Sequence, residues 1–326
     1  MKDGFACSTI PALAIPISFA LCLAAFVARA ADPPGAWSIK SHLPQPRGET
    51  AMAAANGKLY VLGGATLGRD SSPLAEEYDP VTDQWRVLAP IPRATSHPGV
   101  GALNGKLYVV GGFTANIHSG ALDTVFEYDP ATGAWRSLAP LAKPRGSVGV
   151  AALNGKLHAI GGRGPDRVTV ATHEVFDPAS GKWSPAAPLP AARDHLAVVA
   201  AAGKLHVIGG RTNNNTTDNT ARHDVYDPAV DRWSKAAPMP TARSAPGAAL
   251  VNDQILVVGG ECDNGRTFNQ NEAYDTTANR WIALASPVGR HGFGGASLGD
   301  GAYFAGGNKG CGGGDMTDEL LLFRLR

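Results

Sequence analysis

Residues 47–64 read RGETAMAAANGKLYVLGG, and variants of this phrase occur six times along the 326-residue chain. Each variant ends in a double glycine, and successive double glycines lie 47 to 50 residues apart. The six pairs are Gly63-Gly64, Gly111-Gly112, Gly161-Gly162, Gly209-Gly210, Gly259-Gly260 and Gly306-Gly307. A period of this size indicates a repeat architecture, in which each unit buries its apolar face against its neighbours.

Each repeat contains the signals of four short strands. A run rich in Ala, Gly and Val leads into a tight turn, which suits a strand a beside a crowded axis. A hydrophobic run ending in the double glycine predicts strand b. Strand c carries an aromatic residue, mostly followed by Asp-Pro, at Tyr78, Tyr128, Phe176, Tyr226, Tyr274 and Phe323. Strand d carries a tryptophan, at Trp37, Trp85, Trp135, Trp183, Trp233 and Trp281.

These four elements, recurring in register from Trp37 to Arg326, resemble the kelch repeat. The resemblance implies an all-β fold, a six-bladed β-propeller. Trp37 precedes every double glycine, whereas the last double glycine is followed by one strand only, DELLLFRL. We therefore expect the N-terminal strand to supply the outer strand of the sixth blade, beside Leu320 to Leu325, and so to close the ring.

Residues 1–30 differ from the rest in composition. A single lysine, an apolar run from Ile10 to Val27 and the sequence Ala28-Arg29-Ala30 are typical of a secretory signal with its cleavage site. We expect domains at 1–30 (signal peptide) and 31–326 (propeller), with the mature protein periplasmic or secreted and without a membrane span. An uncleaved N-terminal anchor is the alternative. The net charge of +1 argues against nucleic-acid binding.

Two cysteines remain once the first thirty residues are removed. Cys262 and Cys311 follow the fifth and sixth double glycines, so both begin b–c loops on adjacent blades. An oxidising compartment favours a disulfide between them, and two free thiols are the alternative. They do not make a full metal ligand set, so we predict no metal and no cofactor.

The candidate binding face is the one where strand a begins and the b–c loops emerge, because those loops vary while the rest of the repeat does not. Five arginines recur sixteen residues before the double glycines: Arg47, Arg145, Arg193, Arg243 and Arg290. A ring of guanidinium groups at this mouth could bind a carboxylate or acidic sugar. The alternative is that each arginine braces a neighbouring loop. His97 and His195 occupy matching places nearby and complete the predicted ligand-binding set.

Three classes of function fit these observations to different degrees. The best match is an exported binding module that recognises a protein, an anionic glycan or a small molecule on its b–c loop face. The second is an epimerase or mutarotase of acidic sugars, similar to the bacterial kelch N-acetylneuraminate epimerase, for which no catalytic residues can be matched one by one. A copper oxidase similar to galactose oxidase is the least favoured, because the tyrosines belong to the repeat. The pattern favours binding over catalysis.

Overall fold

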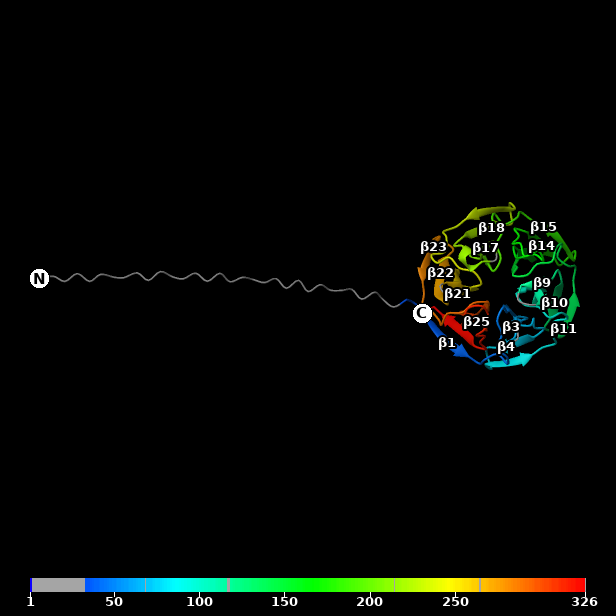
Figure 1. Cartoon of the computed structure of the whole chain (residues 1–326), viewed down its shortest axis with the longest axis horizontal. Helices are drawn as coiled ribbons and strands as arrows, with labels where there is room; N and C mark the ends of the chain where they lie inside the picture. The colour runs from blue at the N-terminus through cyan, green and yellow to red at the C-terminus, as the bar shows by residue number, and fades with distance from the viewer. Residues whose placement is uncertain (2–32, 68, 116–117, 214, 264, 326) are drawn as a thin grey trace. The chain divides into compact units, whose positions relative to one another are not determined.

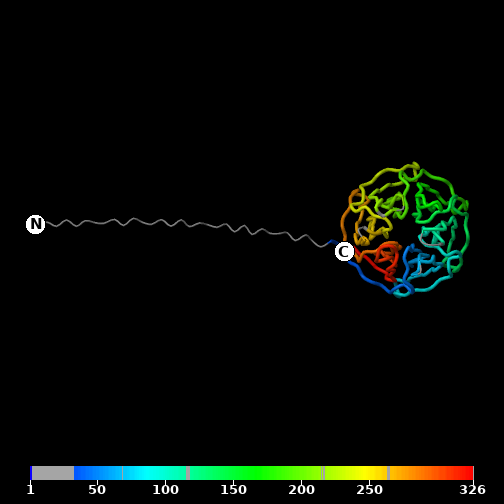
Figure 2. Tube along the Cα trace, viewed as in Figure 1, coloured from blue at the N-terminus to red at the C-terminus, as the bar shows by residue number. Residues whose placement is uncertain are grey.

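A computed structural model describes residue 1 and residues 33–325, apart from 68, 116–117, 214 and 264. The predicted signal peptide and its cleavage site therefore lie outside the described residues. Residues 33–326 form one compact unit, a ring of six four-stranded antiparallel sheets around a central axis (Figures 1 and 2). Within the described part of the chain, no helix has the length and hydropathy needed to cross a bilayer. The six-bladed all-β fold predicted from the repeat is confirmed.

Every blade is built from strands a, b, c and d, from the axis outwards. The a strands are β2 (Ala51–Ala55), β6 (Gly99–Leu103), β12 (Gly149–Leu153), β16 (Ala197–Ala201), β20 (Gly247–Val251) and β24 (Gly294–Leu298). The b strands are β3 (Lys58–Leu62), β7 (Lys106–Val110), β13 (Lys156–Ile160), β17 (Lys204–Ile208), β21 (Gln254–Asp263) and β25 (Gly301–Ala305). The c strands are β4 (Ala75–Asp79), β10 (Val125–Asp129), β14 (His173–Asp177), β18 (His223–Asp227), β22 (Arg266–Asp275) and β26 (Leu320–Arg324). The d strands are β5 (Gln84–Val87), β11 (Ala134–Ser137), β15 (Lys182–Pro185), β19 (Arg232–Lys235), β23 (Arg280–Ala283) and β1 (Ala36–Lys40).

The b–c loops carry the only additional elements in the described residues. They are the hairpin strands β8 (Phe113–Ala115) and β9 (Ser119–Ala121) in blade 2 and the short 3-10 turn η1 (Thr216–Asp218) in blade 4. The β8–β9 hairpin lies inboard of β10, on the side nearer the axis (Figure 1).

Strand a is innermost and its small residues are required there. A Cβ atom added at Gly99 would lie 2.4 Å from Val150 on the next blade, and one added at Gly149 would lie 2.2 Å from Val198. Such separations are far inside van der Waals contact, so larger side chains would push adjacent blades apart. The repeated Ala, Gly and Val runs therefore set how closely the six blades converge.

The N-terminal strand closes the ring. β1 pairs antiparallel with β26, with Trp37 opposite Phe323, and the Trp37 indole donates a 2.6 Å hydrogen bond to the carbonyl of Ala285 on blade 5. The other five tryptophans each donate an equivalent bond to the preceding blade, so the ring of indole bonds is continuous.

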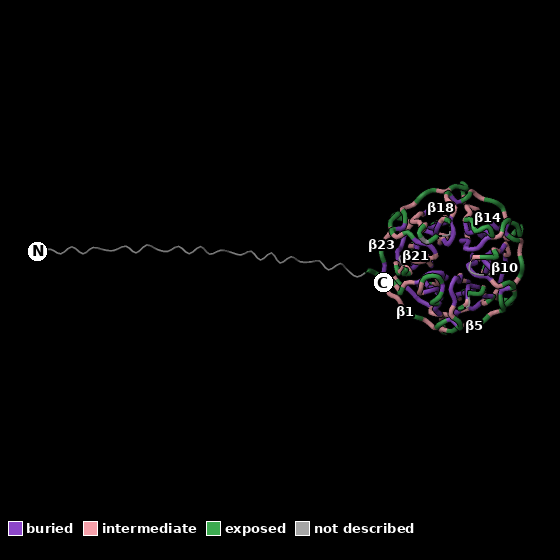
Figure 3. The backbone as a smooth tube through the Cα atoms, in the orientation of Figure 1, coloured by how far each residue is buried: buried purple, intermediate pink, exposed green. Residues whose placement is uncertain are grey.

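The core lies between blades rather than inside them. Each hydrophobic cluster combines side chains from two neighbouring sheets; one of them joins Val258 of blade 5 to Phe304 and Phe323 of blade 6. Figure 3 shows buried backbone towards the inside of the ring and exposed backbone along its outer edge. Each blade therefore depends on both neighbours for its apolar contacts.

Two buried histidine pairs link strands b and c of blades 3 and 4, and each packs against the next blade. His158 and His173 are 2.9 Å apart between Nδ1 and Nε2, and His173 Nδ1 donates to the carbonyl of Ala187. His206 and His223 repeat this arrangement, with His223 donating to Ala237. Each pair is thus a complete hydrogen-bonded chain that ends on the backbone.

Acid should destabilise the fold through these pairs. Burial lowers the pKa of all four histidines to about 4 from an ordinary 6.5. Between these values the unfolded chain binds more protons than the folded one, so stability falls as the pH drops from 6.5 to 4 and is constant above 6.5. One histidine shifted this far loses about 3 kcal/mol across the window. The prediction is tested by measuring the melting temperature at pH 7.5, 6, 5 and 4.5, and it should fall along this series.

Blade 5 offers a matched control, because it carries Leu256 and Asn271 where blade 4 carries His206 and His223. The variant His206→Leu/His223→Asn should lose less stability between pH 6.5 and 4 than the wild type. An equal acid-induced loss in both proteins would show that these histidines do not carry the effect.

Cys262 and Cys311 form a disulfide that links the end of β21 in blade 5 to the b–c loop of blade 6, with their Cα atoms 5.6 Å apart. The bond closes a loop with a sequence separation of 49 residues. Restricting the unfolded chain in this way stabilises by at most about 4 kcal/mol. Reduction, or the variant Cys262→Ser/Cys311→Ser, should therefore lower the melting temperature. Calorimetry with and without reductant measures this change in melting temperature. Identical unfolding transitions in the two conditions would contradict a stabilising role of the disulfide.

Candidate functional site

A ring of six residues surrounds the axis at the start of the a strands. All six adopt left-handed backbone angles, with φ between 51° and 61°, at Glu49, His97, Ser147, His195, Ala245 and Gly292. Backbone hydrogen bonds run from blade to blade along this ring, such as His97 N–H to the carbonyl of Glu49 and Ser147 N–H to that of His97. The six residues line one end of a central cavity of about 170 Å³. We call this set the mouth ring.

Because the fold imposes the left-handed turn on every blade, the residue type there is free to vary. Non-glycine residues rarely occupy this region, and five of them do so here. Four of the six side chains are polar, and they are of three types, Glu, Ser and His, none of which recurs in all blades. Variation at a geometrically fixed position near the axis is what a binding site on a repeat scaffold requires.

The structure corrects the predicted placement of the repeated arginines. Arg47, Arg145, Arg193, Arg243 and Arg290 are at most 1% exposed, and their guanidinium groups contact their own blades instead of opening on the mouth. Each forms an ion pair with a carboxylate of the same blade: the partners, in order, are Glu76, Glu174, Asp224, Glu272 and Glu319. Four of them also bond backbone carbonyls of their own blade, as Arg243 does to Val257 and Gly259. These contacts match the alternative interpretation, in which the arginines act as braces.

Blade 2 supports the interpretation of the repeated arginines as braces. It has Thr95 at the arginine position. At the strand c position that carries the acid in blades 1, 3, 4 and 5 it has Phe126, which pairs with Val109 as Glu76 pairs with Val61. Both charged partners are thus absent together. A buried charge without a partner is costly, so the pair is retained or lost as a unit.

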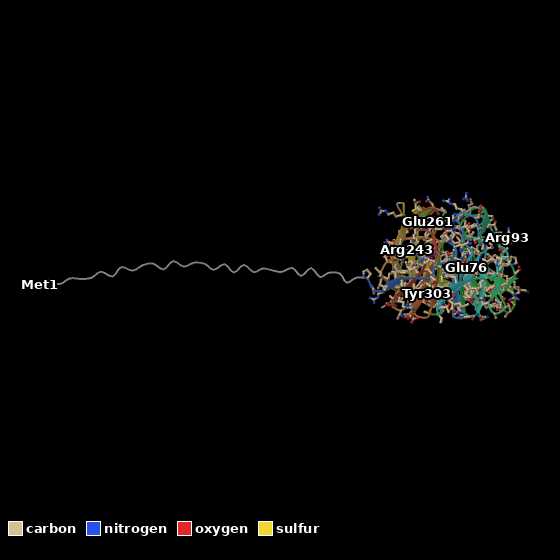
Figure 4. All side chains as sticks on the ribbon, turned by 90° about the horizontal axis from the view of Figure 1, so that it is seen from below. Met1, Glu76, Arg93, Arg243, Glu261 and Tyr303 are labelled. Atoms are coloured by element: carbon tan, nitrogen blue, oxygen red, sulfur yellow. A yellow bond between two sulfur atoms is a disulfide. The ribbon has the colours of Figure 1, made fainter. Side chains whose placement is uncertain are left out.

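A second set of residues lies beside the mouth ring, at the position directly after each double glycine. The chain is extended there and forms an isolated β-bridge with a residue that precedes strand a, as Arg211 does with Asp194. The six residues are Ala65, Phe113, Arg163, Arg211, Glu261 and Asn308. In Figure 4, Glu261 lies towards one face of the propeller, whereas the braces Arg243 and Glu76 lie deeper. Glu261, one of the varied residues, therefore lies nearer that face than these two braces.

A charged network joins blades 4 and 5 at the mouth. His195 Nδ1 lies 2.5 Å from Asp194 Oδ1, Arg211 Nε donates to the same oxygen at 3.2 Å, and Arg211 also pairs with Glu261. Burial, only partly opposed by Arg211, raises the pKa of Asp194. Burial and the nearby Arg211 hold the pKa of His195 well below its usual range. His195 is therefore neutral near pH 7, and its Nε2 carries the lone pair.

A second network joins blades 1, 2 and 6. Glu49 Oε2 lies 3.1 Å from His97 Nε2, and Glu49 Oε1 lies 3.6 Å from His291 Nε2 and 3.3 Å from the side-chain amide of Asn308. Burial alone would raise the pKa of Glu49, but His97 and His291 hold it well below its usual range. Glu49 is consequently an ionised carboxylate inside the mouth.

Arg163 differs from every other arginine buried near the axis. Its side chain is 0% exposed, its Nε and Nη1 make no hydrogen bond within the described residues, and its only bond is a 3.5 Å contact from Nη2 to the carbonyl of His118. No described carboxylate lies within ion-pair distance of it. Its guanidinium carbon lies 5.6 Å from the centre of the Phe113 ring. Burial lowers the pKa of Arg163 to about 10, which still leaves it charged near neutral pH.

Of the predicted site residues, His97 and His195 do lie together at the mouth, with ring centres 5.2 Å apart. Sequence reasoning missed Arg163, Arg211 and His118. The first two share a fixed place after the double glycine, which could have indicated them. His118 lies in the blade 2 loop, where the repeat gives no register.

The comparisons with known proteins agree on the architecture. The family profile described as the Attractin/LZTR1 beta-propeller matches residues 59–317. Among solved structures, one titled "Structure of YjhT" superposes with a TM-score of 0.74 at 19% identity, covering 87% of this chain and 96% of that one. No curated protein sequence matches the chain. Since the profile covers well over half of the sequence, the chain belongs to the Attractin/LZTR1 family of kelch-type β-propellers.

Proposed function

We propose that this protein is a binding propeller that takes a small anionic molecule, an acidic sugar in the first instance, at its mouth. The single observation that carries the proposal is Arg163. The five brace arginines are matched one to one by carboxylates, and Arg211 has two, but Arg163 has none among the described residues. A buried cation without a partner is unfavourable unless a ligand supplies the anion.

The unused N–H groups of Arg163 suit the carboxylate of a polar, hydroxylated molecule that reaches it from the mouth. A planar guanidinium can hold a carboxylate by two parallel hydrogen bonds, from Nη2 together with either Nε or Nη1. Nε and Nη1 are unused, and Nη2 makes only the 3.5 Å contact to His118 among the described residues. Hydroxyl groups of the same ligand could bond Glu49, Ser147 and Asn308, whose side chains lie around the mouth. A ligand of this kind would combine one charge-assisted anchor with several neutral hydrogen bonds.

We also propose that the protein works outside the cytoplasm. The supporting observations are the apolar run and cleavage sequence of residues 10–30 and the Cys262–Cys311 disulfide, since disulfides persist mainly in oxidising compartments. The N-terminal residue of protein recovered from an exporting host tests this: Ala31 is expected, and an intact Met1 would contradict it.

The binding proposal is tested by comparing acidic sugars with a neutral one. N-acetylneuraminate or glucuronate should raise the melting temperature and give a titration isotherm, whereas glucose should do neither. Arg163→Gln should weaken binding about ten- to hundredfold, the value of the charge-assisted bonds. Arg167→Gln is the matched control, because Arg167 is exposed on the same loop. Absence of binding by any acidic sugar, or equal binding by Arg163→Gln, would overturn the proposal.

A second candidate function is an epimerase or mutarotase that acts on such a sugar. The observation that favours it is the Asp194–His195 pair, in which the carboxylate fixes the tautomer of a neutral, buried imidazole beside Ser147 and the cavity. A neutral histidine held in this way can act as a general base. His97, paired with Glu49, would be the group that returns the proton.

Proton NMR of a freshly dissolved anomer tests catalysis directly. An active enzyme would speed anomer exchange, and His195→Gln would abolish that rate while leaving ligand affinity within a few fold. If the wild type binds the sugar without accelerating exchange, the protein is a binding module only.

A further inference from the structure

We propose that His97, His118 and His195 form a binding site for a divalent first-row transition metal ion, with zinc the best match. The three rings come from blades 2 and 4 and from the β8–β9 hairpin region, and one nitrogen of each lies within 4.8 Å of the nitrogens of the other two. Three histidines around one point, with a further position open, are a known zinc ligand set.

The distances between the rings agree with a shared ion. His118 Nε2 and His195 Nε2 are 3.0 Å apart. Two nitrogens that ligate one tetrahedral zinc at the usual bond length are about 3.3 Å apart. The ring centres of His97 and His118 are 4.5 Å apart, and those of His118 and His195 are 4.9 Å apart. A small movement of side chains alone would therefore place all three nitrogens around one ion.

The neighbours of His195 supply the support that a metal-bound imidazole normally has. Asp194 accepts from Nδ1 and so leaves the Nε2 lone pair directed away from the carboxylate. A carboxylate behind a ligating histidine in this way orients the ring and raises its affinity for the ion. His195 Nε2 also has Ser147 Oγ and Arg211 Nη2 at 3.2 Å, more donors than its one lone pair can accept. Arg211 keeps Asp194 and Glu261 as partners if it gives up this contact.

His97 contributes a similar arrangement on the other side. Its Nε2 is buried and makes no hydrogen bond among the described residues, although Glu49 Oε2 lies 3.1 Å away. Glu49 could therefore neutralise part of the charge of the ion or take the open position as an oxygen ligand. Imidazole and carboxylate together favour zinc, cobalt, nickel or copper over magnesium or calcium.

The protein contains an internal contrast to this cluster. His158 with His173, and His206 with His223, are also close pairs, but each has only two rings and ends on a backbone carbonyl. Those pairs are fully satisfied by hydrogen bonds. The mouth cluster instead has a third ring and two carboxylates, which a hydrogen-bonded pair does not need.

The proposal does not involve Arg163 and so stands apart from the anion-binding proposal. A metal on His195 Nε2 would occupy the lone pair that the epimerase candidate needs, so the metal is tested alone. Protein stripped with a chelator and titrated with Co²⁺ should develop the visible absorption of a low-coordinate cobalt site, and Zn²⁺ should displace it. His118→Ala should bind the metal at least tenfold more weakly than the wild type does. Asp194 positions His195 without touching the ion, and Asp194→Asn should weaken metal binding about ten- to hundredfold. His42→Ala is the control, because His42 is an exposed histidine paired with Asp318 far from the cluster along the chain.

Two results would overturn the proposal. One is a wild type that shows no cobalt absorption and no zinc isotherm. The other is equal affinity in the wild type and His118→Ala. Because His118 is in a loop and only partly buried, the fold should survive its replacement, and an unchanged melting temperature of metal-free His118→Ala verifies this.

Discussion

A chain that begins at Pro44 should aggregate or melt far below one that begins at Ala31. The truncation removes β1, its ladder with β26 and the Trp37 indole bond to Ala285. It also leaves the apolar strand β26 as an open edge, which favours aggregation. Loss of the tryptophan packing and the ladder together costs on the order of 5 kcal/mol, comparable to the whole stability of many domains.

Scanning calorimetry and size-exclusion chromatography of the two chains measure this effect. Trp37→Phe in the chain from Ala31 is the control, because it keeps the ladder and loses only the indole bond, and it should fall between them. If the chain from Pro44 melted like the longer one, closure of the ring by β1 would be contradicted.

Arg193→Ala should destabilise the folded protein by about 3 to 5 kcal/mol, because it leaves the buried carboxylate of Asp224 without its main partner. The Arg193–Asp224 distance is 2.6 Å and both side chains are at most 1% exposed. Arg136→Ala is a suitable control, since Arg136 pairs with Glu127 at 2.9 Å but is 65% exposed. That replacement should cost at most about 1 kcal/mol.

Urea unfolding of both variants gives the two free energies. The variant Arg193→Thr/Asp224→Phe, which copies the pair Thr95 and Phe126 from blade 2, should recover part of the loss. Similar free energies for Arg193→Ala and Arg136→Ala would contradict the role of the arginines as braces.

The fold could be predicted because its signals are local and repeated six times. The double glycines turn the chain at the axis, where Gly111 has φ 61° and an added Cβ would lie 2.3 Å from the carbonyl oxygen of Arg145. The N-terminal strand followed from counting, since one tryptophan had no blade of its own. Redundancy of this kind makes each assignment a check on the others.

The sequence-based prediction placed the arginines at the mouth because five copies of one basic residue were interpreted as a ring of charge around the axis. Four of their five partners were visible in the sequence as an acid two residues before the strand c aromatic, in Glu76-Glu77-Tyr78, Glu174-Val175-Phe176, Asp224-Val225-Tyr226 and Glu272-Ala273-Tyr274. A residue that recurs in nearly every repeat is more often needed by every repeat than by one ligand. The mouth residues are those that differ at a repeated position.

The third histidine could not be predicted at all. His118 belongs to blade 2 and lies 77 residues before His195 of blade 4 in the sequence, yet their side chains are in contact. Its position depends on the course of the β8–β9 hairpin, which forms a separate two-stranded sheet outside the four-stranded repeat. The repeat sets the register of the blade strands, but it does not set the course of a long loop, so the loop residues could not be placed.

The central claim is that the repeated arginines hold the fold, while Arg163 holds the ligand. Calorimetric titration of N-acetylneuraminate into Arg163→Gln and Arg193→Gln, each below its own melting temperature, tests it most directly. The account predicts that Arg163→Gln keeps its stability and loses affinity, whereas Arg193→Gln loses stability and keeps affinity. The reverse pattern, with weak binding by a fully stable Arg193→Gln and wild-type binding by Arg163→Gln, would contradict it.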